Sequence, residues 1–139
     1  MSESPFESVE AFLQRVPYAR FLGVRVELAG DEMTAVLPFS QHLIGNPMLP
    51  AIHGGVIGAF LELTALSQMA LAQPGRRIPK TIDITIEYLR SAGPRDTYAR
   101  AILRKVGRRV ANVQVEAWQD SRSKPVAGMT GHFLLRNEV

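Results

Sequence analysis

HGGVIGAFLELTALSQMALA, residues 53–72, is the stretch that decides the fold of this chain. After the two leading glycines, apolar side chains recur on every side at helical spacing, and no proline interrupts them before Pro74. A helix that is apolar all round is a buried helix, and residues 56–72 would span about 25 Å, the width of a small domain. The sequence therefore predicts one long central helix around which the remaining segments pack.

Glu62 is the only charged side chain between His53 and Arg76. A carboxylate in an apolar helix is costly unless a partner or a ligand meets it. Acids are rarely buried without such a partner, so we predict a functional role for Glu62. The alternative is a structural glutamate that is hydrogen-bonded to a neighbouring segment.

Composition limits the class of protein. The 139 residues, 46% of them hydrophobic, suit a single domain over residues 1–139 with one core. There is no cysteine, which excludes disulfides and thiolate chemistry. The N-terminus lacks the basic and apolar regions of a signal peptide, and the polar residues of the central stretch favour a core helix over a membrane span. We therefore expect a cytoplasmic protein that does not bind membranes.

Positive charge is concentrated in the second half, where residues 76–136 carry thirteen basic and five acidic side chains. This excess suits nucleic acid or a small phosphorylated ligand, or else it only solubilises the surface. Aromatic side chains are few there and are not interleaved with basic ones, which argues against nucleic acid. The three histidines are scattered, so we predict no metal site.

The segments outside the central helix have mostly the pattern of strands. A short amphipathic helix is expected at about residues 5–16, where Pro17 stops it. Residues 38–52, rich in proline and glycine yet apolar, predict a binding loop. Alternating apolar residues predict strands at 21–28, 33–37, 81–88, 97–106, 110–118 and 126–135.

These elements predict an α+β fold in which one curved antiparallel sheet wraps around the central helix. In the strand 81–88, simple alternation sets Ile82 on the same face as Ile84 and Ile86, and Thr81 on the other face. Strand faces that the helix does not use are partly apolar, and a monomer would leave them exposed. We therefore expect a homodimer or a dimer of dimers.

Asn46-Pro47, then His53-Gly54-Gly55, then an acid at Glu62 resemble the motif of the hotdog-fold acyl-CoA thioesterases of the PaaI-like (phenylacetate-pathway) group. TIDITIEYLR, residues 81–90, is similar to that group's strand after the helix, and RKVGRR, residues 104–109, to its basic turn. The resemblance covers residues 22–135 and implies the hotdog fold, hydrolysis of acyl-CoA thioesters and dimeric sites. In two departures, the group most often has Asp in place of Glu62, and the loop before His53 is slightly longer here.

Thioester hydrolysis needs a base or a nucleophile at the carbonyl carbon and donors for the oxyanion. Glu62 is the candidate for either of the first two roles. The Gly55 N–H, at the positive end of the helix, is the candidate oxyanion donor, unless the glycines form only a turn. His53 either donates to the carbonyl or shapes the loop. The resemblance adds Asn46 to the site and gives the Thr81 hydroxyl a role in holding the attacking water.

One chain cannot supply this whole site. His53 precedes Glu62 by nine residues, roughly 13 Å along a helix. If both act on one carbonyl, two chains share the site. We therefore predict that Glu62 comes from one chain, while Gly55, His53 and Asn46 come from the other.

The phosphates of coenzyme A, bound as part of the substrate and not as a cofactor, are expected at the basic turn. Arginine offers forked donors to phosphate, and Gly107 lets the backbone turn. A solvated hairpin tip is the alternative. The predicted contacts are Arg90, Lys105, Gly107, Arg108 and Arg109.

The sequence does not identify the acyl group. The apolar loop 43–52, with Phe60 and Met69, is a candidate lining for it, although core packing is the simpler role for both side chains. Two other functions on this fold stay open. A non-catalytic acyl-CoA binding protein would not need Glu62, and a hotdog dehydratase or hydratase needs His and Asp paired across one site.

Overall fold

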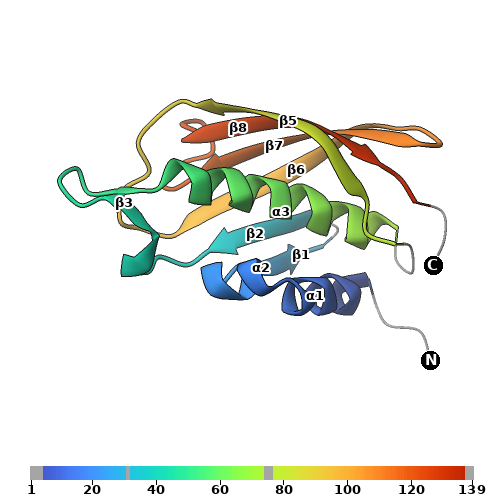
Figure 1. Ribbon diagram of the computed structural model, residues 1–139, viewed down its shortest axis with the longest axis horizontal. Helices are drawn as coiled ribbons and strands as arrows, with labels where there is room; N and C mark the ends of the chain where they lie inside the picture. Colours follow the sequence, from blue (N-terminus) through green and yellow to red (C-terminus); the bar gives the residue numbers. More distant parts are fainter. Residues whose placement is uncertain (1–4, 31, 74–76, 137–139) are drawn as a thin grey trace.

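The computed structural model describes residues 5–30, 32–73 and 77–136 of the protein. Most of the chain forms one sheet and one long helix (Figure 1). The elements in chain order are α1 (Pro5–Arg15), α2 (Pro17–Leu22), β1 (Arg25–Ala29), β2 (Glu32–Leu37), η1 (Gln41–Leu43), β3 (Ile44–Asn46), β4 (Ala51–Ile52), α3 (Gly54–Ala72), β5 (Lys80–Tyr88), β6 (Thr97–Val106), β7 (Val110–Trp118) and β8 (Ala127–Leu134).

The six long strands form one sheet in the order β1-β2-β6-β7-β8-β5, and each neighbouring pair is antiparallel. The helix α3 runs across one face of this sheet, and α1 packs against α3 beside β1 (Figure 1). The predicted α+β fold, an antiparallel sheet wrapped around one long helix, is confirmed. Because β5 is at the end of the order, one of its edges has no strand partner within the described residues.

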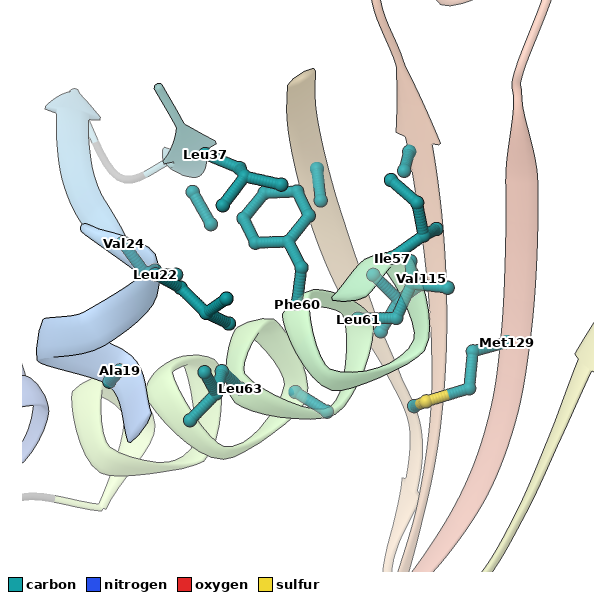
Figure 2. Packing of buried hydrophobic residues seen from close by; sticks show 14 of the residues in the cluster. Ala19, Leu22, Val24, Leu37, Ile57, Phe60, Leu61, Leu63, Val115 and Met129 are labelled. Atoms are coloured by element: carbon teal, nitrogen blue, oxygen red, sulfur yellow. The ribbon is translucent and has the colours of Figure 1, made fainter. Parts of the chain in front are cut away.

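The core lies between α3 and the sheet. Phe60 and Leu61 are fully buried in the middle of the helix. Figure 2 shows Phe60 extending toward Leu37 of β2, while Ile57 and Leu61 lie beside Val115 of β7. By length and composition alone α3 would suffice to cross a membrane, but here it is the helix on which the core is built. Its predicted stop at Pro74 lies outside the described residues.

The segment before β1 differs from the prediction. The strand expected from residue 21 is wrong at its start, because Phe21 and Leu22 end the helix α2. Pro17 is the first residue of α2 and starts a second helix as well as ending α1, since the fixed φ of proline suits a first helical position. Gly23 then ends α2 with a φ of 79°, and β1 begins at Arg25.

The loop 38–52 contains more regular structure than its prolines indicate. It forms the short helix η1 and a small hairpin of β3 and β4, which pair antiparallel. The His53 N–H donates to the Leu43 carbonyl at 2.9 Å, which ties the base of this hairpin to the start of α3.

A β-bulge lies near the start of β5. Thr81 pairs with Phe133, while Asp83 pairs with the adjacent His132, so that Ile82 is the extra residue. Thr81 therefore faces α3, as Ile84 does, and Ile82 is 52% exposed. Simple alternation predicted the opposite face for Thr81 and for Ile82, and that prediction is wrong because the bulge inverts the pattern.

Candidate active site

Glu62 is fixed by Thr81. It lies in the middle of α3, and its Oε2 accepts a 2.7 Å hydrogen bond from the Thr81 hydroxyl of β5. The bulge makes this contact possible, because it turns Thr81 toward the helix. The hydroxyl engages one carboxylate oxygen and leaves Oε1 for another partner. The sequence predicts an enclosed acid, whereas Glu62 is only half-buried in a single protomer.

One stripe of α3 is left uncovered by the chain itself. Gly55, Ala59, Glu62 and Leu66 follow one another at spacings of three or four residues, and none of them is buried. On the opposite side of the helix, positions such as Phe60 are fully buried. The carboxylate and the second glycine therefore belong to the same open face, about 10 Å apart along the helix axis.

The start of α3 is capped by the side chain of His53. The Gly55 N–H donates to Nδ1 of this histidine at 2.8 Å. The N–H groups of Val56 and Ile57 both donate to the His53 carbonyl, at 3.0 and 3.2 Å. Because Nδ1 accepts from a backbone N–H, the neutral imidazole carries its proton on Nε2. His53 thus combines the two roles that the sequence leaves open, since it shapes the backbone and also presents an N–H donor.

The Gly55 N–H, which is the predicted oxyanion donor, is therefore already engaged in the free protomer. A Cβ on Gly55 would come within 3.0 Å of the His53 ring, so glycine is what lets the imidazole lie this close. For another acceptor to reach this N–H, the imidazole would have to turn aside or share the donor. The helix start is an electropositive end even so, because its first N–H groups point out of the helix.

Tyr88, for which sequence reasoning gave no role, contacts the same helix start. Its hydroxyl donates to the Gly54 carbonyl at 2.8 Å. The residue closes β5 and lies opposite Ala127, on the side of the sheet that faces α3. The only signal in the sequence was the place of Tyr88 in the alternating strand. Alternation predicts which face of the sheet a side chain is on, but it does not predict which group its hydroxyl contacts.

Asn46 lies at the end of β3, in the hairpin next to the helix start. It is exposed, and its Oδ1 accepts from the Met48 N–H at 3.0 Å, which forms a local turn. Gly45 packs directly on the base of the hairpin, because a Cβ at this position would be 2.7 Å from the His53 Cα. Asn46 and His53 are therefore joined through one short hairpin, whereas Glu62 lies further along α3.

A cavity of about 360 Å³ opens beside the helix start. Its lining includes Gly54 and Ile57 of α3, Tyr88 of β5, and Arg90 and Ala92 of the segment after β5. Arg90 is exposed at its rim and donates to the Pro125 carbonyl at 2.7 Å. The cavity therefore places one basic side chain in the same lining as Gly54 at the helix start.

The other predicted phosphate contacts lie at the opposite end of the sheet. Lys105, Gly107, Arg108 and Arg109 form the exposed turn between β6 and β7, where the Gly107 N–H donates to the Val110 carbonyl at 3.0 Å. Val110 pairs with Leu134, which pairs in turn with Lys80 at the start of β5. Arg90 follows the far end of that strand, so one protomer does not bring Arg90 to the turn.

The candidate acyl lining divides into two parts. Phe60 and Met69 are buried at 0% and 2% exposure, so both belong to the core. The hairpin tip is different, because Met48 is 90% and Leu49 66% exposed. Large apolar side chains this exposed at a loop tip are available for a ligand or for a second protein surface.

Comparison with known proteins identifies the family of this chain. The family profile of the thioesterase superfamily matches residues 49–126. The medium/long-chain acyl-CoA thioesterase YigI of Escherichia coli K12 is 32% identical, over 91% of this chain and 90% of that protein. The sequence resemblance to hotdog thioesterases is confirmed.

Two solved structures have the same fold. A phenylacetic acid degradation-related protein of Ralstonia eutropha superposes with a TM-score of 0.74 and 26% identity, over 92% of this chain and 99% of that one. A Bacillus halodurans protein crystallised with CoA superposes with a TM-score of 0.79 and 19% identity, over 97% of this chain and 90% of that one.

Proposed function

Because the chain belongs to the thioesterase superfamily, we propose that it hydrolyses acyl-CoA thioesters in a site shared by two protomers. Glu62 of one protomer attacks, or directs water to, a carbonyl held at the partner's helix start. The observation that carries this proposal is the Glu62 carboxylate, fixed by Thr81 at 2.7 Å and set on the uncovered stripe of α3 together with Gly55.

The free edge of β5 supports a shared site. Two copies that pair along this edge about a twofold axis run antiparallel, so that the start of one β5 lies opposite the end of the other. Thr81, at the start, touches Glu62, and Tyr88, at the end, touches Gly54. Such pairing brings each Glu62 to the partner's glycines and bridges the distance of about 10 Å that separates them in one chain.

The same pairing explains the divided basic residues. Within one protomer, Arg90 follows the end of β5, whereas the turn 105–109 lies at the end of the sheet where β5 starts. In an antiparallel dimer, Arg90 of one protomer and the basic turn of its partner are at one end of the site. Both are then available to the phosphates of a single CoA, the molecule held by the Bacillus halodurans neighbour.

The chemistry follows from the groups present. Glu62 takes a proton from water as the water oxygen adds to the carbonyl carbon, and the oxyanion accepts from the Gly55 N–H, from which the His53 ring has turned aside. When the C–S bond breaks, the proton on Glu62 passes to the thiolate and frees CoA. If Glu62 attacks directly instead, the C–S bond breaks, the CoA thiolate leaves and takes a proton from solvent, and an acyl-enzyme anhydride forms, which water hydrolyses at the Glu62 carboxyl carbon. Incorporation of ¹⁸O from labelled water into Glu62 during a single turnover distinguishes the two routes.

The substrate class proposed is medium- to long-chain acyl-CoA, the class named for the Escherichia coli relative. The exposed apolar tip of the β3–β4 hairpin, Met48 and Leu49, supports an extended acyl group. A short or charged acyl group would not bury these side chains. In an extended acyl chain, each CH₂ group that is buried against them contributes about 0.8 kcal/mol to binding.

The test is thiol release from a panel of acyl-CoA esters of increasing chain length. Glu62→Gln keeps the shape and the Thr81 contact but removes the charge, and we expect turnover to fall by at least ~100-fold with the fold intact. Glu87→Gln, an exposed carboxylate on the far face of β5, is the matched control and retains activity. Full turnover by Glu62→Gln would exclude the proposed mechanism.

A further inference from the structure

Tyr88 packs against a surface of glycines on α3. Gly54 and Gly58 are four residues apart and share one face of the helix. A Cβ on Gly54 would lie 3.4 Å from the Tyr88 ring, and one on Gly58 would lie 3.4 Å from its hydroxyl. The phenol therefore lies in direct contact with this face of the helix.

The hydrogen bond of Tyr88 falls on one particular peptide unit. The hydroxyl donates to the Gly54 carbonyl at 2.8 Å, and that carbonyl belongs to the same peptide plane as the Gly55 N–H. The N–H side of this plane donates to His53 Nδ1 at 2.8 Å. The peptide between the two glycines is thus fixed from both sides, by a phenol on its oxygen and by an imidazole on its nitrogen.

From this juxtaposition we infer that Tyr88 is a positioning residue for the thioesterase reaction, and that it aligns and polarises the Gly55 N–H as an oxyanion donor. The inference rests on the proposed function. A hydrogen bond to a peptide oxygen draws electron density from the attached N–H and strengthens the bond that this N–H donates, by roughly 10–30%. The bond also fixes the plane, so the donor keeps its direction when the imidazole turns aside for the substrate.

The position of Tyr88 separates this role from core packing. In one protomer the side chain is 56% exposed at the end of the edge strand, so the core does not depend on its hydroxyl. Tyr88→Phe keeps the ring against Gly54 and Gly58 and removes only the donor. Tyr98→Phe is the matched control, because Tyr98 stacks on Trp118 at a centroid distance of 6.2 Å. It alternates with the buried Ala99, which sets it on the face of the sheet away from α3.

The experiment measures kcat and KM for an acyl-CoA ester in the unmodified protein, Tyr88→Phe, Tyr98→Phe and Glu62→Gln. We expect Tyr88→Phe to lower kcat about tenfold and to change KM less than about twofold. Outright loss of an oxyanion donor costs roughly 100- to 1,000-fold, and here the donor is only weakened. Tyr98→Phe retains both constants. An unchanged kcat in Tyr88→Phe, or a raised KM alone, overturns the inference.

A second readout does not depend on turnover. In ¹⁵N-labelled protein, the Gly55 amide nitrogen senses the hydrogen bond on the preceding carbonyl, so its resonance shifts in Tyr88→Phe and stays in place in Tyr98→Phe. An unmoved Gly55 resonance contradicts the inference even if kcat falls. If the unmodified protein does not hydrolyse acyl-CoA, the proposed function fails and the inference fails with it. If only Glu62→Gln is impaired, the proposed function stands and the role of Tyr88 is refuted.

Discussion

Replacing Thr81 with valine removes one hydrogen bond from the Glu62 carboxylate and little else. The two side chains are similar in shape, and valine suits a strand. The bond lost is the 2.7 Å contact from the Thr81 hydroxyl to Glu62 Oε2. Without it, the carboxylate turns about its side-chain bonds and spends less time aligned with the carbonyl.

The magnitude follows from the type of bond and its exposure. A hydrogen bond to a charged group contributes about 1.5–3 kcal/mol. Glu62 is half-buried in the single chain, so we take the lower end of this range, about 1.5 kcal/mol, which corresponds to roughly tenfold in rate. We therefore expect Thr81→Val to lower kcat about tenfold, while Thr81→Ser, which keeps the donor, stays close to the unmodified protein.

The assay is thiol release under saturating acyl-CoA, with the thermal midpoint and the sedimentation coefficient measured alongside. Thr85→Val is the matched control, because Thr85 lies on the same strand, is exposed and pairs with Thr130 on the far face. Equal activity of Thr81→Val and Thr85→Val would refute the reasoning that the hydroxyl orients Glu62. A fall in the thermal midpoint confined to Thr81→Val would assign the threonine a structural role instead.

Two further predictions concern the substrate and the hairpin. Arg108→Gln combined with Arg109→Gln is expected to raise KM for acyl-CoA several-fold with kcat unchanged, because both side chains are exposed and are the proposed donors to the CoA phosphates. The difference in KM should shrink with added salt, and an unchanged KM removes the turn from the CoA site. Gly45→Ala is expected to destabilise the protein by about 1–3 kcal/mol in chemical denaturation, since its Cβ would be 2.7 Å from the His53 backbone. Gly128→Ala, whose Cβ would be 3.7 Å from its nearest neighbour, is the tolerated control, and equal unfolding free energies would contradict the close approach.

Hydrophobic periodicity was sufficient to predict the long elements. Strands β6 and β7 have the predicted bounds, 97–106 and 110–118, and α3 begins two residues before residue 56. These elements are long and their patterns are regular, so the alternation or helical spacing outweighs local exceptions. Glu62 was informative for a different reason: a single charge on an otherwise apolar helix needs a partner.

The contacts of the site were not predictable from the pattern. The bulge at Ile82 inverts the face of Thr81, and no periodicity signals an inserted residue. The sequence also grouped Arg90 with the basic turn, although sheet register sets them at opposite ends of one protomer. The imidazole on Gly55 and the phenol on Gly54 depend on the direction of side-chain atoms, which residue spacing does not determine.

The central claim, that two protomers share each site, is tested most directly by mixing two inactive variants. Glu62→Gln lacks the carboxylate. Gly55→Pro lacks the N–H donor, at the second residue of α3, where proline removes no hydrogen bond within the helix. In a mixed dimer one site receives both defects and the other receives none. Random equal mixing, after which half of the dimers are mixed, is expected to restore about a quarter of the activity of the unmodified protein. Activity no higher than that of either variant alone, with mixed dimers demonstrated, would contradict the shared site.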